Sequence, residues 1–210
     1  DEGSRPAGRA AEPEHQRAGV RRPVRRRRLA GAAAHGRRLG QDAALNAIAQ
    51  RLRASKTGLT SENGPQGVFL LTGPSGTGKT ETALALADAL FGGEKSLITI
   101  NLSEYQEPHT VSQLKGSPPG YVGYGQGGIL TEAVRKRPYS VVLLDEVEKA
   151  HRDVMNLFYQ VFDRGFMRDG EGREIDFRNT VILMTSNLGS SYLVDPNMSD
   201  EAKRKAVIDR

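Results

Sequence analysis

The chain has 210 residues, of which 37% are hydrophobic, so it can bury one sizeable core but is too short for two complete domains. It contains no cysteine, which excludes disulfides and thiolate zinc sites. Its apolar runs are far shorter than the roughly 20 residues of a membrane-spanning helix, so we expect a cytoplasmic protein that does not cross a membrane.

The formal charge of +5 is concentrated at the N-terminus. Residues 1–38 contain 11 arginines and four acidic residues, and their composition shows neither helical nor strand periodicity. We expect a disordered basic tail here, with an organelle transit peptide or contact with RNA or membrane as weaker alternatives. The remaining residues carry a net charge of −2, which argues against nucleic acid as a partner of the folded part.

Apolar periodicity predicts that ordered structure begins near residue 39. Apolar residues recur at helical spacing from 45 to 52, after Asp42, which can cap a helix. The run 67–72 is continuously apolar between turn residues, which is typical of a strand buried on both faces of a parallel sheet. A second helical stripe covers residues 83–91 and stops at Gly92.

The same alternation continues toward the C-terminus. We predict further strands at residues 97–100, 141–144 and 180–185, further helices at 111–114, 129–134 and 154–162, and a hairpin around 169–172. Strands that alternate with helices indicate an α/β fold, built as a three-layer sandwich on a mostly parallel sheet.

A phosphate-binding pattern stands between the first predicted strand and its helix. The glycines allow backbone N–H groups to curl around phosphates, and the helix directs its positive end toward them. Lys79 is expected to contact the β- and γ-phosphates of ATP, and the Thr80 hydroxyl to bind Mg²⁺. A glycine-rich turn with an exposed lysine is the alternative, which the strand–loop–helix context disfavours. The complete P-loop match is Gly73, Pro74, Ser75, Gly76, Thr77, Gly78, Lys79 and Thr80.

Two later strands end in polar residues. The strand at 141–144 leads into Asp145 and Glu146, as a Walker B segment does, although a helix cap would give the same pattern. We predict that Asp145 holds the metal, partly through water, and that Glu146 polarises the attacking water, which favours hydrolysis over phosphoryl transfer. Asn187 follows the strand at 180–185 and can orient that water, unless it is a simple turn residue. The predicted catalytic residues are therefore Lys79, Glu146 and Asn187.

With these segments in this order, the sequence resembles the AAA+ ATPases. Between Gly40 and Ser190 it is similar to the second AAA+ module of the Clp/Hsp100 unfoldases. The resemblance lies in the segments GPSGTGKTETALALADAL, SEYQEPHTVSQLKGSPPGYVGYGQGG, LTEAVRKRPYSVVLLDEVEKAH and DFRNTVILMTSNLGS. It implies a P-loop NTPase fold, a homo-hexameric ring driven by ATP and Mg²⁺, and a polypeptide substrate that is threaded through the central channel.

The resemblance also assigns roles along the chain. Residues 39–190 would form the large ATPase subdomain, with Leu39 near the adenine, and 191–210 would be a truncated C-terminal segment. The helical lid, the arginine finger and sensor-2 would lie outside the chain. We therefore expect the 1–210 chain alone to be monomeric and nearly inactive.

The family grips its substrate with a Gly-aromatic-hydrophobic-Gly loop, here Gly120 to Gly123, so Tyr121 and Val122 are predicted to contact polypeptide. The sequence around them agrees, because Tyr121 and Tyr124 lie among two prolines and five glycines, with little apolar content to bury them. Tyrosines that pack back onto their own domain are the alternative.

Within the family, residues 156–176 are most similar to ClpV, which disassembles contracted type VI secretion sheaths. ClpB-type disaggregases are the near alternative. A small-molecule P-loop kinase would need an acceptor pocket and an arginine-rich lid, and a nucleic-acid AAA+ switch would need a basic ordered domain; the sequence shows none of these.

Overall fold

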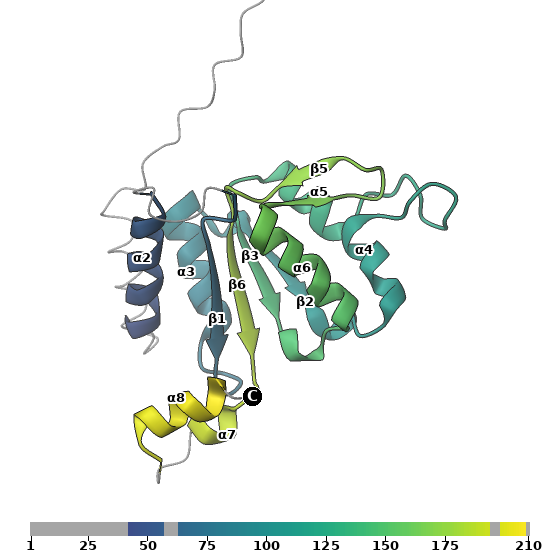
Figure 1. Ribbon diagram of the computed structural model, residues 1–210. Helices are drawn as coiled ribbons and strands as arrows, with labels where there is room; N and C mark the ends of the chain where they lie inside the picture. The colour runs from purple at the N-terminus through teal and green to yellow at the C-terminus, as the bar shows by residue number, and fades with distance from the viewer. Residues whose placement is uncertain (1–41, 57–62, 194–197, 209–210) are drawn as a thin grey trace, which may run out of the picture.

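A computed structural model describes residues 42–56, 63–193 and 198–208. Its centre is a four-stranded parallel sheet with the strand order β1-β6-β3-β2 (Figure 1). The predicted basic tail and Leu39 lie outside the described residues. The strands are β1 (Gly67–Thr72), β2 (Leu97–Asn101), β3 (Val141–Asp145) and β6 (Val181–Ser186).

Helices cover both faces of the sheet, as a three-layer sandwich requires. Two helices pack on one face and three on the other, and each face has its own apolar core. Helices are needed on both faces because successive side chains of a strand point to opposite faces, and in the central strand β3 both sets of side chains are fully buried. The first layer consists of α2 (Asp42–Lys56) and α3 (Lys79–Phe91), and the second of α4 (Val111–Lys115), α5 (Ile129–Lys136) and α6 (Arg152–Arg164).

The remaining elements are short. As predicted, β4 (Phe166–Arg168) and β5 (Glu174–Asp176) form an antiparallel hairpin. Short 3₁₀ turns lie at Glu94–Ser96, Leu102–Glu104, Pro108–Thr110 and Val147–Lys149. Two C-terminal helices, α7 (Ser190–Leu193) and α8 (Asp200–Ile208), lie below the carboxyl edge of the sheet in Figure 1. No helix in the described part of the chain is both long and apolar enough to span a bilayer.

Helix α8 was not expected from the sequence. The signal was present in Ser199, whose hydroxyl accepts the Ala202 N–H at 3.2 Å, as an N-cap residue does. Ser199 is followed by Asp200 and Glu201, and acidic residues are favoured in the first turn of a helix.

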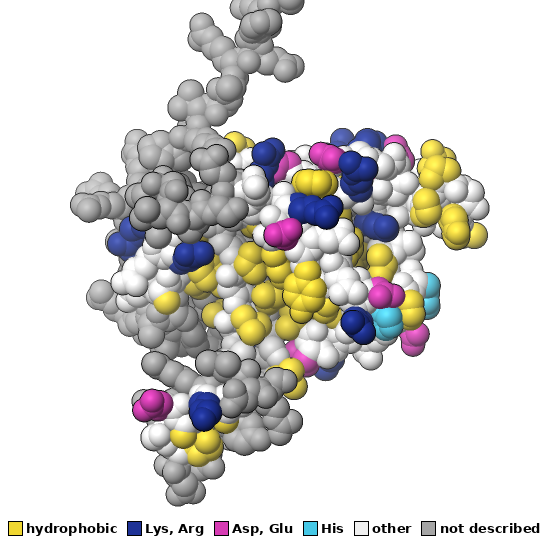
Figure 2. All heavy atoms as spheres, viewed as in Figure 1, with side chains coloured by type: hydrophobic (Ala, Val, Ile, Leu, Met, Phe, Trp, Pro, Cys, Tyr) yellow, Lys and Arg dark blue, Asp and Glu magenta, His cyan; other side chains and the backbone are white. Residues whose placement is uncertain are grey.

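The expected burial of β1 on both faces is wrong. Among the described residues β1 pairs with β6 alone, so it is an edge strand, and Leu70 is 53% exposed. Leu70 and Val68 point to the same face of the sheet, which α6 covers only in part. Hydrophobic side chains consequently gather on the surface over β1, β6 and α6 (Figure 2).

Candidate nucleotide-binding site

The P-loop connects β1 to α3 at the carboxyl edge of the sheet. It leaves β1 at Gly73, whose N–H donates to the Ser186 carbonyl at 3.2 Å and so anchors the loop to the end of β6. It enters α3 through Gly78, whose φ of 83° lies in the left-handed region that side chains with a Cβ avoid. The first N–H groups of a helix lack partners within it, so the start of α3 is suited to bind an anion.

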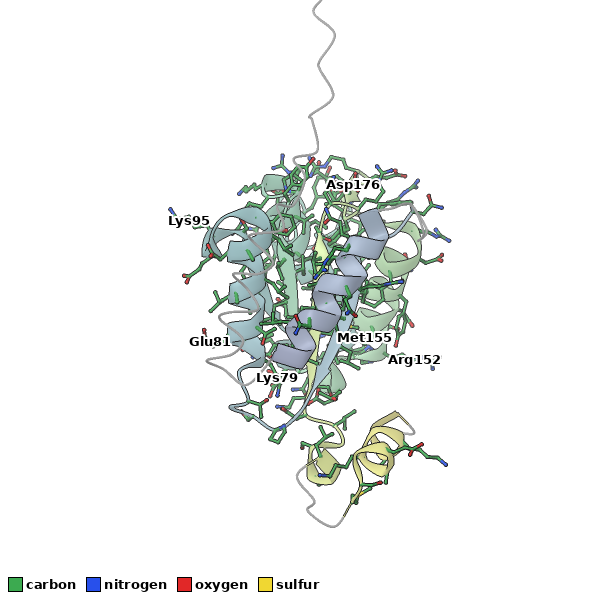
Figure 3. All side chains as sticks on the ribbon, turned by 90° about the vertical axis from the view of Figure 1, so that its left-hand side faces the viewer. Lys79, Glu81, Lys95, Arg152, Met155 and Asp176 are labelled. Carbon is green, nitrogen blue, oxygen red and sulfur yellow. The ribbon has the colours of Figure 1, made fainter. Side chains whose placement is uncertain are left out.

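Lys79 ties this loop to the neighbouring strand. Its ammonium donates to the carbonyls of Gly73 at 2.7 Å and Pro74 at 2.9 Å, and to Asn187 Oδ1 at 3.0 Å. Two predicted catalytic residues, Lys79 and Asn187, are therefore in direct contact although 108 positions separate them in the chain. Figure 3 shows Lys79 at the start of α3 and Lys95 beyond the opposite end of that helix.

Asp145 and Glu146 stand where β3 ends. Glu146 has φ 57° and ψ 50°, and it is the one residue other than glycine with a positive φ in the described part of the chain. Its carboxylate accepts a hydrogen bond from the Lys149 ammonium at 2.9 Å, and this bond raises the pKa of Lys149 above its usual value. The predicted catalytic carboxylate of Glu146 is therefore paired with Lys149 in this structure.

Two residues that the sequence analysis missed hold this region together. The Thr185 hydroxyl donates to Asp145 Oδ1 and accepts the Glu146 N–H at 3.2 Å. Glu148 accepts the Asn187 N–H at 3.2 Å. A signal for Thr185 was available, because it is a polar residue at the end of an otherwise apolar strand, two positions before Asn187.

The predicted residues from three strand ends converge on one hollow of about 300 Å³. Its lining combines the Lys79 ammonium and the P-loop backbone with the carboxylates of Asp145 and Glu146. Thr80 and Asp145 offer oxygen atoms, which are the ligands that Mg²⁺ prefers. This charge pattern fits a phosphate chain with a divalent cation. The hollow is lined by Ser75, Gly76, Gly78, Lys79, Thr80, Glu81, Asp145, Glu146 and Asn187.

The predicted threading residues lie outside this hollow, on the loop between α4 and α5. Tyr121 is 70% exposed and Val122 is fully exposed, so neither packs against the domain. The loop projects from the body of the molecule in Figure 1, and its hydrophobic side chains stand apart from the rest in Figure 2.

The base of this loop rests on the turn of the hairpin. The Gly170 N–H donates to the Lys115 carbonyl at 2.9 Å, and a Cβ on Gly170 would lie 2.5 Å from the Ser117 carbonyl oxygen. Asp169 fixes the turn itself by accepting the backbone N–H groups of Glu171 and Arg173, each at 2.9 Å, and the Arg173 Nε at 2.7 Å. Backbone therefore packs directly on backbone where the loop meets the hairpin.

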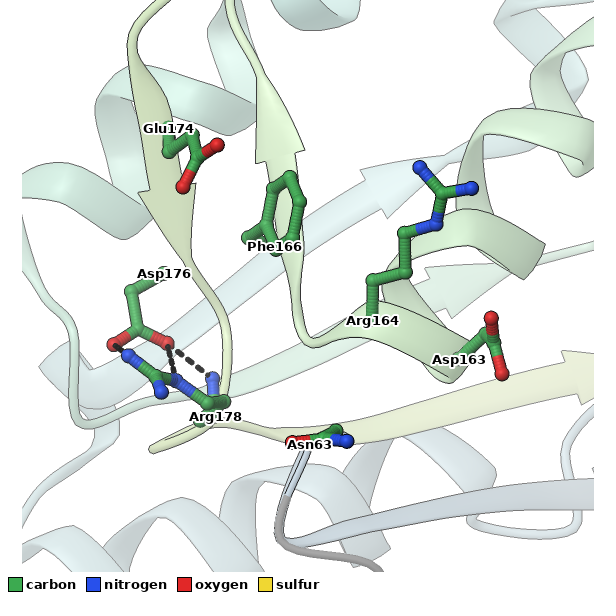
Figure 4. A pocket seen from close by; sticks show the side chains of 7 residues that line it. All are labelled: Asn63, Asp163, Arg164, Phe166, Glu174, Asp176 and Arg178. Atoms are coloured by element: carbon green, nitrogen blue, oxygen red, sulfur yellow. Dashed lines mark hydrogen bonds and ion pairs between the residues drawn. The ribbon is translucent and has the colours of Figure 1, made fainter.

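A larger hollow of about 620 Å³ opens at the opposite end of the sheet (Figure 4). It contains none of the residues predicted to act on nucleotide. Its charges are mixed, and Arg178 is paired there with Asp176 through two guanidinium hydrogen bonds of 2.9 and 3.0 Å. The lining consists of Asn63, Asp163, Arg164, Phe166, Glu174, Asp176 and Arg178.

Comparison with known proteins agrees with this geometry. Residues 64–209 match the model of the AAA domain (Cdc48 subfamily). The chain is 63% identical to the AAA+ ATPase ClpV1 of Pseudomonas aeruginosa over 167 residues, which are 78% of this chain and 18% of that protein. It is 64% identical to the chaperone protein ClpB of Yersinia enterocolitica over 155 residues, covering 74% of this chain and 17% of that protein.

A further relative is the chaperone protein ClpB of Propionibacterium freudenreichii, 56% identical over 174 residues, which are 82% of this chain and 20% of that protein. The chain thus spans a fifth or less of the length of these relatives. Identities of 63% and 64% do not separate ClpV from ClpB. The predicted fold and family resemblance are confirmed: the chain belongs to the AAA domain family, Cdc48 subfamily, as a Clp-type AAA+ ATPase module.

Proposed function

We propose that this module binds ATP with Mg²⁺ and hydrolyses the terminal phosphate to drive the remodelling of other polypeptides. The observation that carries the proposal is the convergence of Lys79, Asp145, Glu146 and Asn187 on the hollow beside the P-loop. A glycine-rich turn alone would not assemble an ammonium, two carboxylates and an amide from three strand ends.

Each side chain has a separate task in the proposed reaction. Lys79 moves from the carbonyls of the P-loop to the phosphate oxygens and neutralises their charge. Glu146 accepts a hydrogen bond from the attacking water, which Asn187 orients from the end of β6. Thr80 and Asp145 would hold Mg²⁺, which would supply positive charge to offset the negative charge on the phosphate.

The exposed loop between α4 and α5 suggests the class of substrate on which the ATPase acts. Tyr121 and Val122 present apolar surface on a projecting loop, which suits contact with extended polypeptide of varied sequence. We infer that six copies of the full-length protein form a ring in which these loops thread the substrate. The substrate of a ClpV-like protein is the contracted type VI secretion sheath, and we favour this function because residues 156–176 resemble ClpV.

A trap experiment tests the function and separates the two substrates. The full-length protein with Glu146→Gln is expected to bind ATP without hydrolysing it, and so to retain its substrate. Sheath subunits recovered with the trap would support the ClpV-like function, and aggregated client proteins would support the ClpB-type alternative. The double variant with Lys79→Ala is the matched control, since it cannot bind ATP and should retain neither.

A further inference from the structure

The backbone ladder between the two catalytic strands ends just before the catalytic residues. The register of β3 and β6 pairs Leu144 with Met184 and stops there. The residues proposed to act on ATP come next: Asp145 at the end of β3, Glu146 directly after it, and Asn187 directly after β6. Their mutual position therefore depends on side-chain contacts beyond the ladder.

Thr185 makes the contacts that replace the ladder at this point. Its hydroxyl donates to Asp145 Oδ1 and accepts the Glu146 N–H at 3.2 Å, so its donor and an acceptor site are both used by the neighbouring acidic pair. Thr185 is 1% exposed, and a buried polar group that loses its partner is strongly disfavoured. The Thr185 hydroxyl is consequently held in one position against Asp145 and the Glu146 N–H.

Packing alone does not explain a threonine at this position. Val181 and Leu183 precede Thr185 on the same side of β6, and both are apolar and fully buried. A valine would continue this pattern with almost the same shape. What distinguishes Thr185 is its hydroxyl, and the hydroxyl reaches the two acidic residues of β3.

The bond to the Glu146 backbone acts on a strained residue. Glu146 has a left-handed conformation, which is strained for a residue with a Cβ and persists only where the surroundings enforce it. The Thr185 hydroxyl holds the Glu146 N–H in this conformation and fixes the rotation of the Asp145 carboxylate at the same time. We propose that Thr185 is a positioning residue for ATP hydrolysis, which aligns both acids without contacting nucleotide; this inference rests on the proposed function.

The test compares Thr185→Val with Thr185→Ser in the full-length protein by steady-state ATP hydrolysis. Thr185→Val removes the hydroxyl and keeps the shape, so we expect kcat to fall by about tenfold or more while KM changes less than about threefold. Thr185→Ser retains the hydroxyl and should restore kcat to near the parent value. A loss of kcat in Thr185→Ser equal to that in Thr185→Val would overturn the proposal.

Two further variants separate positioning from stability. Thr180→Val is the matched control, because Thr180 is also buried and directly precedes β6, but its hydroxyl donates to the Phe177 carbonyl at 2.7 Å, at the other end of the strand. It should lower thermal stability and leave kcat unchanged. If Thr185→Val does not fold, Thr185→Cys gives the same test, since a thiol is a much weaker donor.

Different experimental results would refute the role of Thr185 and the proposed function. Parent-like kcat in Thr185→Val beside an inactive Glu146→Gln would overturn the role of Thr185 and leave the proposed function in place. Parent-like hydrolysis by Glu146→Gln would refute the proposed function itself, whatever the Thr185 variants do.

Discussion

Replacing Lys79 by alanine is expected to abolish measurable binding of Mg-ATP. In the structure its ammonium uses all three donors on oxygens at 2.7, 2.9 and 3.0 Å, namely two backbone carbonyls and the Asn187 amide. These acceptors are neutral, whereas the phosphate oxygens that would replace them carry charge. Binding therefore exchanges weaker hydrogen bonds for stronger ones at the same ammonium.

The size of the effect follows from the hydrogen bonds that the Lys79 ammonium would donate to the phosphates. Hydrogen bonds to charged groups contribute about 1.5–3 kcal/mol each, so two such bonds to phosphate oxygens contribute about 3–6 kcal/mol. Since about 1.4 kcal/mol corresponds to a tenfold change in Kd, Lys79→Ala should weaken binding by roughly 10²- to 10⁴-fold.

Isothermal titration calorimetry of the 1–210 chain with Mg-ATP measures this directly. Lys95→Ala is the matched control, because Lys95 is an exposed lysine beyond the far end of α3 and should bind like the parent. Thermal unfolding of both variants shows whether the fold is retained. Binding by a folded Lys79→Ala within about threefold of the parent would refute the assignment of the site.

Three further outcomes are expected. Glu146→Gln should preserve nucleotide binding and block phosphate release in the full-length protein, because an amide cannot polarise water; unchanged release would contradict this. Tyr121→Ala should abolish threading of a labelled polypeptide and leave basal hydrolysis nearly intact, whereas the exposed control Tyr139→Ala should retain both activities; loss of both in Tyr121→Ala would indicate a structural tyrosine. Burial disfavours the charge on Asp169, but the hydrogen bonds from Arg173 and backbone N–H groups outweigh it and lower its pKa. The ionised Asp169 carboxylate therefore contributes its full stabilisation of the fold above the ordinary pKa of 3.8, and this contribution is lost as the pH falls below that value. The Tm difference between the parent and Asp169→Asn should consequently vanish in acid.

The sequence was sufficient for the strands, the main helices and the P-loop because their signals are local. The continuous apolar run of β3 and the helical apolar stripe of α6 both mark residues that are buried against neighbours. Gly78 and Gly92 take left-handed conformations at the two ends of α3, and this requirement is visible in the sequence as glycine. The order of the strand ends then predicts that Asp145 and Asn187 meet at one edge.

The details that were missed depend on register and on neighbours. No local pattern shows that Thr185 stands beside Asp145 and Glu146, because this follows from how β3 and β6 are aligned. The Lys149 contact with Glu146 depends on the 3₁₀ turn that follows β3. The exposure of Leu70 likewise depends on which strands flank β1, a property of the sheet that its own sequence does not carry.

The strained backbone of Glu146 lowers the stability of the fold at a residue whose side chain is proposed to be needed for ATP hydrolysis. A glycine at this position would relieve roughly 1–2 kcal/mol of left-handed strain and remove the carboxylate in the same step. Stability alone would therefore favour loss of this carboxylate, whereas the proposed ATP hydrolysis requires it. Engineering of this module for durability should consequently leave residue 146 untouched and seek its improvements elsewhere, for example on the exposed side of β1.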